Sequence, residues 1–175
     1  MNLLLAGKPA VGKTTLVEQV VARLQAAGWR LSGFLTREVR DPRGARTGFK
    51  IITLDGEEGE LARIGLPGPV RVGRYGVNLA DLERLTLPRI RVRDADLLVI
   101  DEIGKMECAS GRFRRGVEDA LDAPTPVLAT LGTGPAYFLA ALRARPDVEL
   151  LQVTEKTRAQ RLDEVLARLG RGRRG

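Results

Sequence analysis

The apolar residues of this chain follow two repeating patterns, and the order of these patterns predicts the fold. Short unbroken apolar runs, such as residues 3–6, 97–100 and 127–129, are typical of strands that are buried on both faces of a sheet. Elsewhere, apolar residues recur every three or four positions, as they do on the buried face of a helix. The back half of the chain alternates between these patterns, which predicts an α/β fold with a mostly parallel sheet between two layers of helices.

Cap residues, glycines and prolines indicate where the elements begin and end. We expect helices at residues 13–27, with Gly28 after the last turn, from Asn78 to an end at Pro88, from Ser110 through Leu121, at 136–144, and from a Thr154 cap to an end at Gly170. We expect strands at residues 2–6, 32–39, 47–54, 61–64, 70–77, 97–100, 126–131 and 148–153, with the segment 103–107 outside the strand before it.

The front part of the chain has several strand-like runs with no helix between them. A turn sequence at residues 41–44 joins the first two runs into a hairpin. We therefore expect one domain over residues 1–175, with a strand-rich antiparallel insert at about 32–77 and a basic tail at 170–175. The hairpin carries Arg37, Arg40, Arg43 and Arg46, which are either ordinary exposed turn residues or an arginine-lined edge near a bound nucleotide.

The first strand leads directly into residues 7–14, whose sequence GKPAVGKT fits the phosphate-loop pattern G-x-x-x-x-G-K-[ST]. Gly7 and Gly12 allow the backbone to curl around an anion, and the helix that follows directs its positive end to the same place. In such a loop Lys13 reaches the β- and γ-phosphates and the Thr14 hydroxyl binds Mg²⁺. A glycine-rich turn that binds nothing is the alternative, but the strand before it and the helix after it favour the phosphate loop.

Two acids follow the buried run at residues 97–100. An acid at the C-terminal end of a buried strand lies where open α/β sheets bind ligands, so Asp101 fits the residue that holds Mg²⁺, through water, in a phosphate-loop enzyme. Glu102 is placed to orient and deprotonate a water that faces the γ-phosphate, or alternatively to cap the segment that follows. Lys105 either pairs with Glu102 or Glu107 or stabilises charge on the transferred phosphoryl group.

Composition and charge narrow the classes of function. The chain has no histidine and Cys108 is its only cysteine, which excludes histidine-dependent catalysis and an internal disulfide and makes a zinc cluster unlikely to form. The net charge of +7 is dispersed apart from the tail residues Arg168, Arg171, Arg173 and Arg174, so a solvated surface is favoured over nucleic-acid binding. Without a membrane-spanning run or a signal-peptide pattern, we expect a cytoplasmic monomer that does not bind membranes.

Four stretches resemble the small nucleoside-triphosphatases of the THEP type, whose vertebrate members are called cancer-related nucleoside-triphosphatases. They are GKPAVGKTT (7–15), GFLTREVRDPRGARTGF (33–49), VGRYGV (72–77) and LVIDEIGKME (98–107), and the resemblance covers nearly the whole chain. It implies a phosphate-loop fold of the RecA-like type, which has an additional strand and a catalytic glutamate. It also implies Mg²⁺-dependent hydrolysis of nucleoside 5′-triphosphates to diphosphates with loose base preference. Cys108 stands where a larger apolar residue is expected, which bears on packing.

The expected catalytic residues are Glu102, Lys13 and Lys105, and the expected metal ligands are Thr14 and Asp101. The expected nucleotide-binding residues are Gly7, Lys8, Pro9, Ala10, Val11, Gly12, Lys13, Thr14, Thr15, Leu98, Val99, Ile100, Asp101, Glu102, Ile103, Gly104 and Lys105. A kinase that transfers the γ-phosphate to a nucleotide or small metabolite is an alternative function, with the insert as its acceptor site. A nucleic-acid-dependent ATPase, suggested by the basic tail, ranks third.

Overall fold

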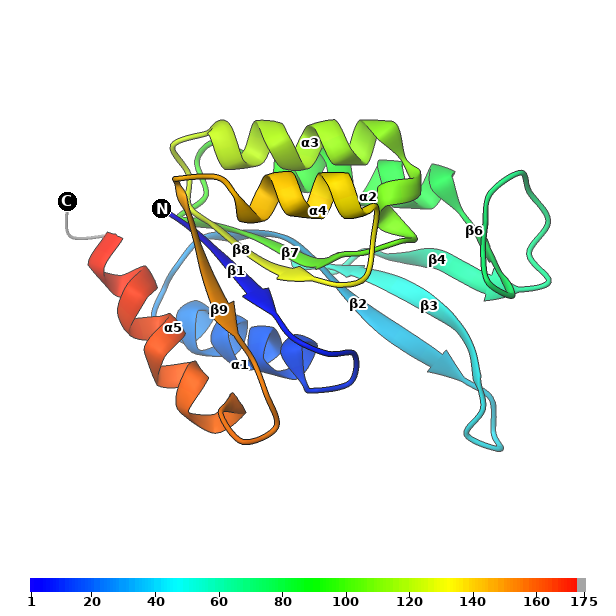
Figure 1. Cartoon of the computed structure of the whole chain (residues 1–175), viewed down its shortest axis with the longest axis horizontal. Helices are drawn as coiled ribbons and strands as arrows, with labels where there is room; N and C mark the ends of the chain where they lie inside the picture. Colours follow the sequence, from blue (N-terminus) through cyan, green and yellow to red (C-terminus); the bar gives the residue numbers. More distant parts are fainter. Residues whose placement is uncertain (173–175) are drawn as a thin grey trace.

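The structure is a computed structural model, and it describes residues 1–172 of the chain. Its strands form one sheet in the order β5-β6-β4-β3-β2-β7-β8-β1-β9 (Figure 1). The strands are β1 (Asn2–Ala6), β2 (Leu31–Arg40), β3 (Arg46–Thr53), β4 (Glu58–Ile64), β5 (Arg71–Val72), β6 (Tyr75–Val77), β7 (Leu97–Ile103), β8 (Val127–Leu131) and β9 (Val148–Gln152). The helices are α1 (Lys13–Ala26), α2 (Leu79–Ile90), the short 3-10 helix η1 (Glu107–Ala109), α3 (Gly111–Asp122), α4 (Ala136–Arg143) and α5 (Arg158–Gly172).

The strands β2, β7, β8, β1 and β9 form the parallel part of the sheet. Helices α1 and α5 cover one face of this part, and α2, α3 and α4 cover the other (Figure 1). This confirms the expected α/β fold with three layers. Strand β8 lies between β1, which precedes the phosphate-loop sequence, and β7, which carries Asp101. This position of β8 is that of the additional strand expected for the RecA-like type.

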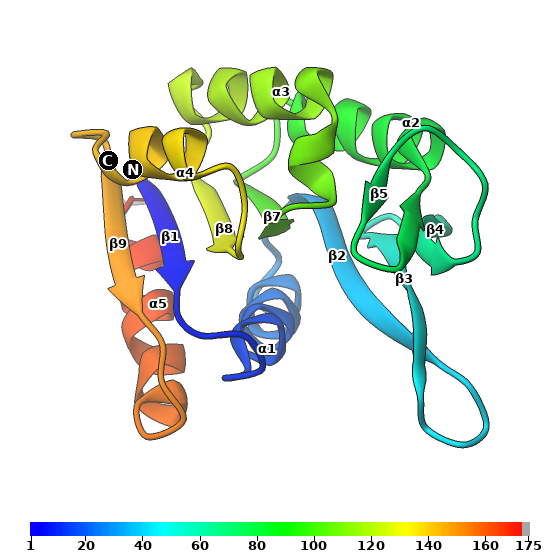
Figure 2. The ribbon, with the colours of Figure 1, turned by 45° about the vertical axis from the view of Figure 1, so that its right-hand side comes forward.

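An antiparallel extension made of β3, β4, β6 and β5 continues the sheet beyond β2. The first four residues of β2, Leu31 to Phe34, pair in parallel with β7, and antiparallel pairing with β3 begins at Phe34, so the extension begins at residue 34 and not at residue 32. The expected strand at 70–77 is two strands, because Gly73 takes a φ of 58° and the chain reverses there. The β2–β3 hairpin extends past the rest of the sheet on the side where α1 lies (Figure 2).

Two expected element ends are wrong, and burial explains both. Helix α2 continues past Pro88 to Ile90. Leu87 and Ile90 are buried in the core, and this burial outweighs the one hydrogen bond that a proline cannot donate. Strand β7 continues to Ile103, which is fully buried and pairs with Leu131 of β8. The chain therefore leaves the sheet after residue 103.

The last helix also differs from expectation at both ends. Helix α5 begins at Arg158, four residues after Thr154, and a turn at residues 155–157 precedes it. The Thr154 hydroxyl accepts a hydrogen bond from the Thr157 N–H at 3.2 Å across this turn. The helix continues through Gly170, because Leu169 is buried and holds this last part against the sheet. The end of the expected basic tail, which contains Arg173 and Arg174, lies outside the described residues.

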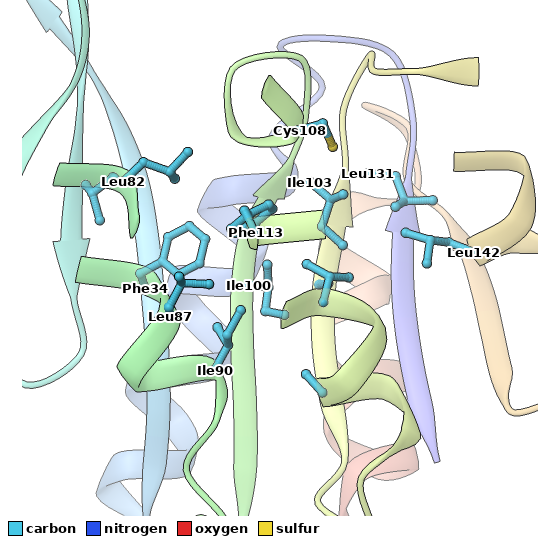
Figure 3. Packing of buried hydrophobic residues seen from close by; sticks show 14 of the residues in the cluster. Phe34, Leu82, Leu87, Ile90, Ile100, Ile103, Cys108, Phe113, Leu131 and Leu142 are labelled. Atoms are coloured by element: carbon cyan, nitrogen blue, oxygen red, sulfur yellow. The ribbon is translucent and has the colours of Figure 1, made fainter. Parts of the chain in front are cut away.

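The apolar core consists of one cluster on each face of the sheet. In the larger cluster, Phe34 of β2 and Phe113 of α3 meet edge to face with their ring centroids 6.1 Å apart (Figure 3). Cys108 belongs to this cluster and is 1% exposed, so the smaller side chain is accommodated without exposing the core. In the part of the chain that the structure describes, no helix combines the length and apolar character needed to cross a membrane.

Candidate active site

The predicted phosphate loop joins the end of β1 to the start of α1. Gly12 takes a φ of 92°, a left-handed conformation that favours glycine. Gly7 packs so closely on the end of β9 that a Cβ atom there would lie 2.4 Å from the carbonyl oxygen of Val153. The Lys13 ammonium folds back over the loop and donates to the carbonyl oxygens of Gly7 at 3.0 Å and Lys8 at 3.1 Å. The loop thus brings a cation and the N-terminal end of a helix to one place, as phosphate binding requires.

Asp101 is the most buried acid of this region, with no exposed surface. Its Oδ1 accepts hydrogen bonds from the hydroxyls of Thr130 at 2.6 Å and Thr14 at 3.2 Å. Burial raises the pKa of this carboxyl group, while Thr130, Thr14 and the backbone N–H of Thr36 on β2 lower it and the charge of Glu18 raises it. Its Oδ2 has no hydrogen-bond partner among the described residues. A buried carboxylate oxygen without a partner is costly, so it points to a missing ligand.

The donor set around Asp101 fits a magnesium ion. Mg²⁺ prefers oxygen ligands and is usually held by one or two protein groups, with waters and substrate phosphates completing its octahedron. The free Oδ2 of Asp101 and the Thr14 hydroxyl supply oxygens next to the loop that would hold the phosphates. The described residues contain no group of three or more histidine, cysteine, aspartate or glutamate side chains that could hold a metal alone. At this site Mg²⁺ would take its remaining ligands from waters and from a bound phosphate.

Glu102 is partly buried beside Asp101. Its carboxyl group lies between two glycines, since a Cβ atom would come within 2.9 Å of it at Gly104 and within 2.5 Å at Gly132. Burial raises the pKa of Glu102, the charge of Asp101 raises it further, and the charge of Lys13 lowers it. The carboxyl group is thus confined between two glycines where the charge of Lys13 acts on it, and a raised pKa is typical of a group that accepts a proton during catalysis.

Glu107 is 4% exposed, and its Oε2 lies on the same side of Gly104 as Glu102, since a Cβ atom at Gly104 would come within 2.9 Å of both carboxyl groups. Its Oε2 accepts a hydrogen bond from the Gly104 N–H at 3.2 Å. Burial, followed by the charge of Glu102, raises the pKa of Glu107 to about 8. At neutral pH the Glu107 side chain is therefore mainly protonated.

The remaining predicted site residues differ in exposure. Exposed residues are Lys8, Pro9, Ala10, Thr15 and Lys105, and buried ones are Val11, Leu98, Val99, Ile100, Ile103 and Gly104. The buried apolar side chains belong to the core and position the loop and the acids. Among the described residues, Lys105 makes no salt bridge with Glu102 or Glu107, and the helix that follows is capped by Ser110 and not by Glu102.

Three of the four hairpin arginines form ion pairs within the chain. Arg37 of β2 pairs with Glu18 of α1 at 2.8 Å. Arg40 and Arg46 both pair with Glu38 at the far end of the same hairpin. The first pair connects the hairpin to the helix that starts at the phosphate loop, whereas the others stay within the extension.

Sequence reasoning missed four residues that the structure brings to the site, namely Glu18, Thr36, Thr130 and Gly132. Thr130 is the one polar residue inside the apolar run of β8, a pattern that signals a buried hydrogen bond. The other three carry no comparable signal. Their place follows only from the pairing of β2, β7 and β8 and from the packing of α1.

The parallel sheet with its additional strand and the loop between β1 and α1 define a phosphate-loop NTPase fold. A sequence model of a family described as NTPase matches residues 2–166. This match spans most of the chain, and the protein belongs to that family.

Named relatives and solved structures agree with this assignment. The chain is 46% identical over 169 residues to the nucleoside-triphosphatase THEP1 of Thermotoga sp. (strain RQ2), covering 95% of this chain and 94% of the relative. It is 38% identical to the human cancer-related nucleoside-triphosphatase over 94% of both chains. The crystal structure of THEP1 from Aquifex aeolicus superposes with a TM-score of 0.86 at 36% identity, covering 97% of this chain and 99% of that one.

Proposed function

We propose that this protein hydrolyses nucleoside triphosphates to nucleoside diphosphates and inorganic phosphate, that it requires Mg²⁺, and that it accepts several bases. The observation that carries the proposal is the confinement of the Glu102 carboxyl group between Gly104 and Gly132, directly after Asp101 and within the range of the Lys13 charge. A proton acceptor thus follows Asp101, the expected metal ligand, and lies where the charge of Lys13, the expected phosphate-binding residue, acts on it. The relatives named as nucleoside-triphosphatases support the same reaction.

In this proposal the phosphate loop binds the part of the substrate that all nucleoside triphosphates share. Lys13 leaves the carbonyl oxygens of Gly7 and Lys8 and turns its ammonium to the β- and γ-phosphates. Thr14 and Asp101 hold Mg²⁺, which when bound offsets negative charge on the phosphate oxygens. Because these contacts reach only phosphates, they support loose base preference.

Glu102 acts as the general base. Its carboxylate orients a water and takes one proton from it as the water oxygen bonds to the γ-phosphorus and the bond to the bridging oxygen breaks. The electron pair of that bond stays on the diphosphate. Lys13 stabilises the charge that develops, together with Lys105, which lies exposed beyond the end of β7. Positioning and charge stabilisation carry most of the catalysis in such reactions.

Phosphate release tests the proposal. Wild type and Glu102→Gln are incubated with ATP, GTP, CTP and UTP, with Mg²⁺ or with EDTA, and with or without RNA. We expect turnover of all four nucleotides that needs Mg²⁺, is independent of RNA and is lost in the variant. Tight nucleotide binding without release in any condition would contradict hydrolysis and favour transfer to an acceptor, which a panel of small hydroxyl-bearing metabolites would then identify by a phosphorylated product. Release that needs RNA would favour the nucleic-acid-dependent alternative.

A further inference from the structure

Arg37 of β2 forms an ion pair with Glu18 of α1. Nη2 of Arg37 lies 2.8 Å from Oε1 of Glu18, and its Nε donates to the same oxygen at 2.9 Å. Glu18 follows Thr14 by one helical turn, so the two side chains lie on the same face of α1. The charge of Glu18 acts on Asp101, whose Oδ1 accepts a hydrogen bond from Thr14. The Arg37 guanidinium is therefore held at the edge of the proposed phosphate and metal site.

The register of the sheet places Arg37 just past the two acids. Phe34 of β2 pairs with Ile100 of β7, so the next residues of β2 lie beside Asp101 and the backbone N–H of Thr36 acts on that carboxyl group. Arg37 lies on the same face of β2 as the side chain two positions earlier, which packs in the cluster that includes α1. At about 3.3 Å per residue, Arg37 is about 7 Å past the level of Asp101, on the side where the γ-phosphate would lie.

The other three arginines of the hairpin are placed elsewhere. Arg40 and Arg46 share Glu38, and the Arg46 guanidinium also lies 5.2 Å from the ring centroid of Phe49. Arg43 belongs to the turn at the tip of the hairpin, between β2 and β3. Of these four arginines, Arg37 is the one paired with the helix of the phosphate loop.

From this placement we infer that Arg37 binds the γ-phosphate during hydrolysis, in addition to Lys13, and that Glu18 holds Arg37 ready when no nucleotide is bound. The inference rests on the proposed function. The side chain of Arg37 is 53% exposed and that of Glu18 is 31% exposed. Solvent screens this ion pair, so Arg37 loses little free energy when it leaves Glu18 for the phosphate. A guanidinium carries a fork of N–H donors that can bind two oxygens of one phosphoryl group, whereas in the pair with Glu18 both contacts go to one oxygen, Oε1.

Arg37 takes part in no covalent bond that forms or breaks during hydrolysis. The water oxygen bonds to the γ-phosphorus, the bond from phosphorus to the bridging oxygen breaks with its electron pair on the diphosphate, and the water proton passes to Glu102. Charge accumulates on the bridging and γ-phosphoryl oxygens during this step. Contacts from Arg37 that are stronger in this state than in the bound substrate raise kcat and leave the affinity for the diphosphate product almost unchanged.

The test compares Arg37→Ala, Arg37→Lys and Glu18→Gln with Arg43→Ala, a matched control from the same hairpin. We expect Arg37→Ala to lower kcat by about 10³, in the range found for arginines of this role, and Arg37→Lys to recover only part of the loss. Glu18→Gln removes the same ion pair but keeps the arginine, so it should lose far less activity than Arg37→Ala. Arg43→Ala should match wild type.

A binding measurement separates this role from a structural one. Wild type and Arg37→Ala are titrated with ADP and with ADP plus aluminium fluoride, a mimic of the phosphoryl group in transfer. We expect equal ADP affinity and about 10²-fold weaker binding of the aluminium fluoride complex in the variant. Equal losses in Arg37→Ala and Glu18→Gln, or equal binding of the mimic, would overturn the inference while wild-type hydrolysis still supports the proposed function. Absence of hydrolysis in wild type would instead overturn the proposed function and, with it, the role of Arg37.

Discussion

Gly132, in the loop after β8, lies directly against the carboxyl group of Glu102. A Cβ atom at position 132 would come within 2.5 Å of Glu102 Cδ and Oε1 and 2.7 Å of Oε2. The loop is held there because the Gly132 N–H donates to the carbonyl oxygen of Ile103 at 3.0 Å. A loop from one strand thus fixes the position of an acid on its neighbour.

Gly132→Ala should lower kcat while nucleotide affinity stays near that of wild type. The added methyl group must displace the Glu102 carboxylate, and a displacement of about 1 Å in a catalytic group can cost about 10²-fold in rate. Steady-state phosphate release and a nucleotide titration measure the two effects. Gly134→Ala is the matched control, because its nearest atom is 3.3 Å away at the flexible end of Leu139. A Gly132→Ala enzyme with unchanged kcat would show that the loop does not confine Glu102.

Glu102→Gln should lower kcat by about 10²–10⁴, the usual contribution of a general acid or base. The amide is nearly the same size and still fits between Gly104 and Gly132, but it cannot accept the proton of the attacking water. Nucleotide affinity, measured by titration with ADP and with a slowly hydrolysed triphosphate, should be retained. Loss of binding together with kcat would assign Glu102 to substrate binding instead of proton transfer.

Glu107 should make the fold less stable as the pH rises. Its pKa of about 8 in the folded protein lies above the ordinary value of 4.5. Between these values the folded protein keeps a proton that the unfolded chain has lost, so its free energy of unfolding falls by up to about 1.4 kcal/mol per pH unit from this residue. Urea unfolding at about pH 5, 6.5 and 8 should show a steeper fall in wild type than in Glu107→Gln, which keeps the acceptor for Gly104. Parallel slopes would contradict a protonated Glu107.

Asp101→Asn should raise the Mg²⁺ concentration needed for half-maximal activity by about 10–100-fold, as expected when a group that orients a metal or its waters loses its charge. It should not lower the free energy of unfolding measured without Mg²⁺, because the asparagine removes a buried charge whose Oδ2 has no partner. Thr130→Ser, which keeps the 2.6 Å hydrogen bond to Oδ1, serves as the control. An unchanged Mg²⁺ requirement would remove Asp101 from the metal site.

The local sequence correctly predicts a helix end where one local hydrogen bond decides its position. The caps at Asn78 and Ser110 form as expected, since each side chain accepts from the backbone N–H three residues later. The expected ends at Pro88 and Gly170 are wrong. At both positions apolar side chains near the helix end pack on the sheet, and this tertiary burial outweighs a local preference of about 1–3 kcal/mol.

The phosphate-loop pattern and the pair Asp101–Glu102 could be predicted from the sequence, because the groups of each are adjacent in the chain and the flanking apolar runs indicate the strands that carry them. The residues that surround them could be identified only from the fold. In the chain, Thr130 follows Asp101 by 29 residues and Gly132 follows Glu102 by 30 residues, whereas Arg37 precedes Glu102 by 65 residues. Thr130 and Gly132 contact the acids, and Arg37 comes to the same end of the sheet, because β8 and β2 pair with β7 on its two sides. Strand pairing is a long-range interaction that leaves no local pattern.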